Sequence, residues 1–194
     1  PLYDGSLFMI LRISGHDFAY EMENILRLFY PGEKIRVISS SEELEKLEAG
    51  APPVYRTEIA ALPDGSLELA ASGATDSVRC GQPSGASADS LEKSLARLLY
   101  QLLSKETGKQ PPWGILTGVR PVALCRRFLA KGQTSSEVGQ LLREEYLVSE
   151  TKIELAMELA EQQEKQLARL APQGFSLYIS IPFCPSRCLY CSFV

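Results

Sequence analysis

The first part of the chain alternates short apolar runs with amphipathic stretches. Residues 6–14, SLFMILRIS, form an apolar run of the length of a buried strand. A helix is predicted from Asp17 to the Pro31-Gly32 pair, because apolar residues recur there at helical spacing and Pro-Gly ends a helix. Residues 34–39, KIRVIS, predict a second strand from their β-branched side chains.

Two further elements complete this part of the pattern. Residues 41–50, SEELEKLEAG, predict a short helix with a serine that caps its start and a glycine that ends it. Residues 54–62 and 66–71 predict a β-hairpin around the turn sequence Pro-Asp-Gly. The order strand, helix, strand, helix, strand, strand predicts an α/β fold, a small sandwich over residues 1–80.

The pattern then becomes helical. Residues 81–88 are rich in Ser, Gly and Ala and lack periodicity, which predicts a linker. Residues 89–173 predict a helical region with apolar residues at helical spacing, in which Thr134 and Glu137 have the spacing of a capping box. Residues 174–194 begin with FSLYISIPF, a near-continuous apolar run typical of a strand covered on both faces.

Composition narrows the classes of function. The chain is 45% hydrophobic and 23% charged, which is ordinary for a globular protein. Its net charge of −4 and the lack of a basic block argue against nucleic acid or an anionic membrane as partner. With no apolar run of membrane-spanning length and no visible signal peptide, we expect a cytoplasmic protein. Because the sequence starts at Pro1 and stops inside an apolar run, we expect a fragment of a longer protein.

The cysteines carry the candidate chemistry. Three of the five lie close together, as Cys184-x₃-Cys188-x₂-Cys191. The odd number and the expected compartment argue against a disulfide framework. A zinc site takes four ligands, and only the distant Cys80 and Cys125 remain to complete one. Three thiolates on a four-iron cluster leave one iron open to a ligand, and we favour this hypothesis over half a zinc site or three structural thiols.

The sequence LYISIPFCPSRCLYCSF resembles the CxxxCxxC motif of radical S-adenosylmethionine (SAM) enzymes, and among them the oxygen-independent coproporphyrinogen III oxidases. PPWGILTGVRP and ISGHDFAYEMENILRLFYPGEKI are similar to the HemZ-type branch, called coproporphyrinogen dehydrogenase. The resemblance implies that residues 174–194 begin a (β/α) barrel, truncated after its first strand. It implies a [4Fe-4S] cluster on Cys184, Cys188 and Cys191, with SAM as the second cofactor. It further implies coproporphyrinogen III or a related porphyrin as substrate, and a reductant protein as partner.

The resemblance also implies a reaction, the oxidative decarboxylation of two propionates to vinyl groups in haem biosynthesis, for which the fragment alone is expected to be inactive. Tyr178, Tyr190 and Phe193 match cofactor-binding positions of the family, and Phe183 matches another apolar position near the cluster. No catalytic residue is assigned. Ser180 departs from the pattern, since relatives commonly carry histidine there. This departure keeps open an alternative, a haem-binding chaperone-like protein that retains the cluster motif without oxidase activity.

Other unusual residues have simpler explanations than catalysis. His16 precedes a predicted helix and is expected in a turn or cap. Because it is the only histidine in the chain, metal sites with several histidine ligands are excluded. Cys80 and Cys125 are expected to be partly buried thiols. PPWGILTGVRP is expected to be a packing joint between the helical region and the barrel, anchored by Trp113. The alternative is that Arg120, at a helix N-terminus, pairs with an anion such as a propionate.

Overall fold

The computed structural model describes residues 8–39 and 53–169, together with 174, 175, 177–179, 181, 183 and 184. The helix predicted at 41–50 lies outside these described residues. The chain divides into two units, Pro1–Ala160 and Glu161–Val194. No helix among the described residues has both the length and the apolar character needed to cross a membrane.

In the described part of the chain, five strands form one mixed sheet in the order β2-β1-β3-β4-β5. β1 lies between β2 and β3 and pairs in parallel with both, whereas β3 with β4 and β4 with β5 are antiparallel. The predicted α/β fold and its β-hairpin, formed by β3 and β4, are confirmed. The strands are β1 (Phe8–Ser14), β2 (Lys34–Ile38), β3 (Val54–Ala61), β4 (Leu67–Ser72) and β5 (Ser77–Gln82).

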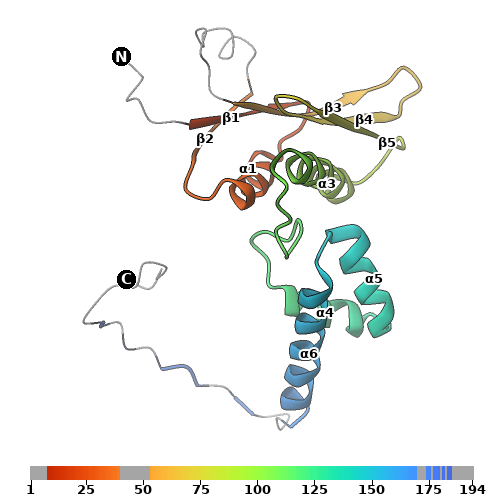
Figure 1. Ribbon diagram of the computed structural model, residues 1–194. Coiled ribbons are helices and arrows are strands. Elements are labelled where there is room, and N and C mark those ends of the chain that lie inside the picture. Colours follow the sequence, from red (N-terminus) through yellow and green to blue (C-terminus); the bar gives the residue numbers. More distant parts are fainter. Residues whose placement is uncertain are drawn as a thin grey trace. The chain divides into compact units, whose positions relative to one another are not determined.

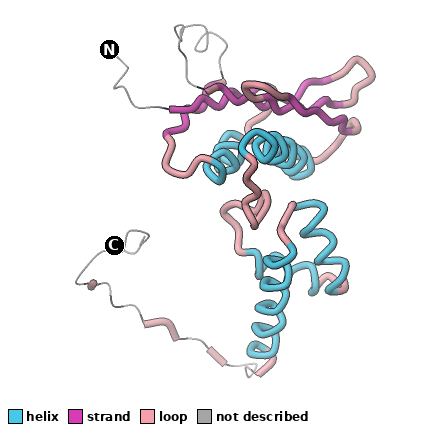
Figure 2. Tube along the Cα trace, in the orientation of Figure 1, coloured by secondary structure: helices cyan, strands magenta, loops and turns pink. Residues whose placement is uncertain are grey.

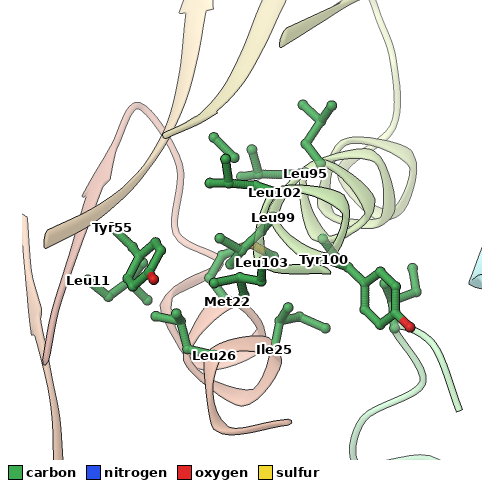
Figure 3. Close-up of a cluster of buried hydrophobic side chains, with 14 of the residues drawn as sticks. Leu11, Met22, Ile25, Leu26, Tyr55, Leu95, Leu99, Tyr100, Leu102 and Leu103 are labelled. Carbon is green, nitrogen blue, oxygen red and sulfur yellow. The ribbon is translucent and has the colours of Figure 1, made fainter. Parts of the chain in front are cut away.

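Two helices, α1 (Ala19–Phe29) and α3 (Ala88–Thr107), cover one face of this sheet (Figure 1). Because side chains alternate along a strand, Met9, Leu11 and Ile13 of β1 all face the helices and enter the first hydrophobic core. Each fully buried leucine stabilises the fold by about 2 kcal/mol. Figure 3 shows Leu99 and Leu103 of α3 close to Met22 of α1. The buried residues of α3 are Leu95, Ala96, Leu98, Leu99, Tyr100, Leu102 and Leu103.

The structure corrects the sequence-based boundary near residue 80. Residues 77–82 form the edge strand β5, which the sequence pattern did not predict, and its Val78 and Cys80 pack against the first core. The predicted linker at 81–88 is shortened to 83–87, because residues 81 and 82 belong to β5 and Ala88 begins α3, which shares that core with the sheet. The separation of an α/β domain at 1–80 from a helical region at 89–173 therefore does not hold for α3, because its leucines are what close the sheet's apolar face.

The three following helices build a second core. They are α4 (Pro121–Ala130), α5 (Ser135–Tyr146) and α6 (Glu150–Leu167), and Figure 2 shows that the regular structure described after β5 is helical. The predicted capping box is confirmed at α5, where the Glu137 N–H donates to Thr134 Oγ1 at 3.3 Å and the Thr134 N–H donates to Glu137 Oε2 at 2.7 Å. The buried residues of this core are Leu124, Cys125, Val138, Leu142, Val148, Ile153, Ala156 and Ala160.

PPWGILTGVRP joins the two cores. The side chain of Ile115 is buried in the first core, whereas Trp113 and Leu116 pack against the second. The backbone of this stretch is bonded to the segment between α5 and α6: the Ile115 N–H donates to the Tyr146 carbonyl oxygen, and the Ser149 N–H donates to that of Pro112, both at 2.9 Å. The predicted packing joint is thus present, but it connects these two cores.

Gly114 makes the joint possible. Its φ of 57° lies in the left-handed region, and an added Cβ would overlap the carbonyl oxygen of Tyr146 and lie 2.5 Å from that of Leu147. The two backbones can approach this closely only because no side chain stands between them. Gly118 has a similar φ of 66° but faces open space, with no atom within 4 Å of an added Cβ.

These two glycines give a matched test of the joint. Gly118→Ala should cost about 1 kcal/mol, because alanine resists the left-handed conformation. Gly114→Ala should cost roughly 3 to 4 kcal/mol, since overlap with backbone atoms adds to the same conformational cost. Urea unfolding of both variants measures the difference, and equal losses at the two positions would contradict the proposed role of the close approach.

Candidate functional site

The cysteine segment is only partly described. Cys184 is exposed and is not in a disulfide, whereas Cys188 and Cys191 lie outside the described residues. Within the described ranges, no group of three or more His, Cys, Asp or Glu side chains is placed to hold a metal ion. The structure therefore shows one of the three candidate ligands, with its thiol accessible.

The other candidate residues near the cysteines are also only partly described. Tyr178 is 80% exposed and Phe183 is 85% exposed. Tyr190 and Phe193, together with the divergent Ser180, lie outside the described residues. The cofactor-binding roles expected for these residues therefore stay predictions.

The strand predicted at 175–183 is not formed by the residues described there, which have irregular backbone. A strand is held by hydrogen bonds to a neighbouring strand, and no strand pairing includes these residues. Because residues 176, 180 and 182 lie outside the described part of the chain, the first barrel strand stays a prediction. Its apolar side chains are 75–86% exposed, namely Phe175, Leu177, Tyr178, Ile179, Ile181 and Phe183.

His16 has the turn role expected for it. Its Nδ1 accepts a hydrogen bond from the Phe18 N–H at 3.2 Å, next to the start of α1. The neutral ring then carries its proton on Nε2, which donates to Oγ1 of the buried Thr57 at 3.1 Å. Burial lowers the pKa of His16, which also suits a ring that must stay neutral to accept.

The two isolated cysteines belong to different cores. Cys80 is half-buried on β5 against the first core, and Cys125 is fully buried on α4 in the second. Burial raises the pKa of the Cys125 thiol, so it is held in the neutral form. Cys80 is partly buried as predicted, whereas Cys125 is buried more deeply than predicted.

Arg120 occupies the predicted helix terminus. It is the residue before Pro121, at the N-terminal cap of α4, and its side chain is exposed. α4 has no acidic residue in its first turn and no side-chain cap. The helix position is confirmed, and pairing of Arg120 with an anion stays a prediction.

The chain is similar to a known protein over about half of its length. No protein-family profile matches it. It is similar to "Oxygen-independent coproporphyrinogen-III oxidase-like protein HemZ" of Bacillus subtilis (strain 168), with 34% identity over 105 residues. The match covers 53% of this chain and 21% of that protein, so the chain corresponds to about a fifth of the relative's length. The similarity supports a relationship to coproporphyrinogen-III oxidase-like proteins.

The titration of His16 gives a test of its structural role. Its folded-state pKa lies below the ordinary value of 6.5, so the folded protein binds this proton less readily than the unfolded chain. The stability that the neutral ring contributes is therefore complete above that value and is lost as the pH falls through the lowered pKa. Urea unfolding between about pH 7.5 and 5.5 should show this loss, because no other histidine titrates there.

His16→Asn is the control for this measurement. Its side-chain oxygen can still accept from the Phe18 N–H, but it does not titrate. The stability of this variant should change less with pH over the same range. A variant with the same pH dependence as the original chain would show that His16 is not the group responsible.

Proposed function

We propose that this chain is part of a radical SAM protein of the oxygen-independent coproporphyrinogen III oxidase type, acting in haem biosynthesis. The observation that carries the proposal is the spacing Cys184-x₃-Cys188-x₂-Cys191, and the similarity to the HemZ protein of Bacillus subtilis supports it. The free, exposed thiol of Cys184 supports it as well, because a thiol must be accessible and unoxidised to become a ligand.

In this proposal the chain's own residues have distinct roles. Cys184, Cys188 and Cys191 would hold three irons of a [4Fe-4S] cluster, and Tyr178, Tyr190 and Phe193 would contact SAM or shield the cluster. When bound, the two cofactors supply the one-electron chemistry that oxidative decarboxylation of a propionate requires. The exposed apolar side chains at 175–183 would be covered by further β/α units, which would also keep water from the site. A reductant protein would deliver the electron.

The cluster is tested by metal content in the longer protein that we expect to contain this chain. Anaerobic reconstitution should give about four irons per chain, and Cys188→Ala should lose the cluster because one of its three thiolates is removed. Cys80→Ala is the control, since this half-buried thiol packs against the first core and should leave the iron content unchanged. A full cluster in Cys188→Ala, or an equal loss in Cys80→Ala, would overturn the ligand assignment.

A second function is favoured by Ser180, which stands where relatives commonly carry histidine. In this alternative the protein binds haem, retains the cluster and does not decarboxylate coproporphyrinogen III. The two functions are distinguished by an assay in which the reconstituted protein receives coproporphyrinogen III, SAM and a reductant in the absence of oxygen. We expect vinyl products together with 5′-deoxyadenosine. Tight haem binding without any turnover would instead establish the alternative.

A further inference from the structure

A hollow of about 420 Å³ lies beside the joint, among side chains from the end of α3, the loop that follows, and the end of α5. This volume is within the range of pockets for small organic ligands. Its lining residues come from three parts of the chain, and none of them belongs to the cysteine segment. They include Tyr100, Gln101, Ser104, Gln110, Arg143 and Leu147.

The polar side chains of this hollow offer hydrogen-bond donors that the protein does not use. Oγ of Ser104 is buried and makes no hydrogen bond to any described residue. A buried hydroxyl without a partner is rare, because losing water without replacing its hydrogen bond is costly. Gln101 and Gln110 are exposed, so their side-chain amides are accessible to a ligand. A bound acceptor would satisfy the Ser104 hydroxyl.

The charge of the lining favours an anion. Arg143 is its one charged residue, and no Asp or Glu lines the hollow. Arg143 pairs with Glu150 through Nε and Nη2 at 2.6–2.9 Å, and the two side chains are 50% and 57% exposed. No hydrogen bond to a described residue uses its Nη1. An exposed ion pair of this kind is weak, so an anion in the hollow can use the free nitrogen and compete with Glu150.

The remaining surface is largely apolar. The ring of Tyr100 lies at the edge of the first core with its hydroxyl directed away from the cluster (Figure 3), where it donates to the Pro111 carbonyl oxygen at 2.9 Å. Pro111 and Pro112 form another part of the wall. Leu147 completes it with a φ of 57°, the one left-handed residue other than glycine among those described. Strained backbone of this kind often accompanies ligand sites.

We propose that this hollow binds a small organic carboxylate with an apolar body. The carboxylate would accept from Arg143 and Ser104, and the apolar body would lie against Tyr100 and the two prolines. The proposal goes beyond the function proposed above, because it concerns a ligand site that does not depend on a cluster. A ligand held there would contact both α3 and α5, and so would stiffen the joint between the two cores.

The test uses phenylacetate as the probe, with the full chain labelled for NMR. We expect saturable shifts of the side-chain amides of Gln101 and Gln110 and of the backbone amides of 147–149, with a dissociation constant on the order of 1 mM. Phenylacetamide, which has the same shape but no charge, should bind at least about tenfold more weakly. Equal binding of the two compounds, or no shift at these residues, would overturn the proposal.

Two variants that break the same ion pair make the test sharper. Arg143→Gln removes the cation and should weaken phenylacetate binding about tenfold or more. Glu150→Gln removes the competitor, frees Arg143, and should strengthen binding about threefold. If the ion pair mattered only for structure, both variants would change binding in the same direction, which would contradict the proposal. Because both side chains are half exposed, both variants should fold, and their unfolding midpoints check this.

Discussion

The close backbone contact at Gly114 is the constraint on which the arrangement of the first 160 residues depends. Two hydrophobic cores form separately, one under the sheet and one among α4, α5 and α6. What connects them is a short irregular stretch whose backbone lies directly against the backbone of 146–149. Irregular backbone in a buried position must find partners for its polar groups, and here the two stretches supply partners to each other. A side chain at Gly114 would separate them.

Charged side chains reinforce the same connection from its exposed side. Glu145 at the end of α5 lies 3.2 Å from Lys93 and 3.6 Å from Arg97, both on α3. These pairs are partly exposed, so each contributes little by itself. They nevertheless orient the two helices, because both pairs hold the end of α5 against α3. Tyr146, next to Glu145, packs against both cores. The hollow beside the joint follows from this geometry, since an irregular stretch cannot fill the space between two helices as evenly as a third helix would.

The cysteine motif lies in a different part of the sequence from the residues of the two hydrophobic cores. The cysteine motif was identified from the spacing of three residues, because ligands supplied by a single loop leave a local pattern. The described structure places only Cys184 of this set, and it adds that the thiol is free and accessible. For His16 the structure defines the role, because the hydrogen bonds to Phe18 and Thr57 engage both ring nitrogens and leave neither for catalysis. The hollow could not be found from sequence, since its lining comes from residues up to 49 positions apart, from Tyr100 to Ser149.

Several local elements, and the start of one helix, could be predicted from residues close together in the chain. Helical spacing of leucines defined α3, Thr134 with Glu137 defined the start of α5, and Pro-Asp-Gly defined the hairpin of β3 and β4, because each depends on residues only a few positions apart. Two features became visible only from packing between distant residues: residues 77–82 form a strand, and α3 shares a core with the sheet. An edge strand with few large side chains has a weak pattern, and it forms because β4 offers unpaired backbone groups. The residues described between 175 and 183 have the stronger apolar pattern, but no strand pairing in the described part of the chain includes them.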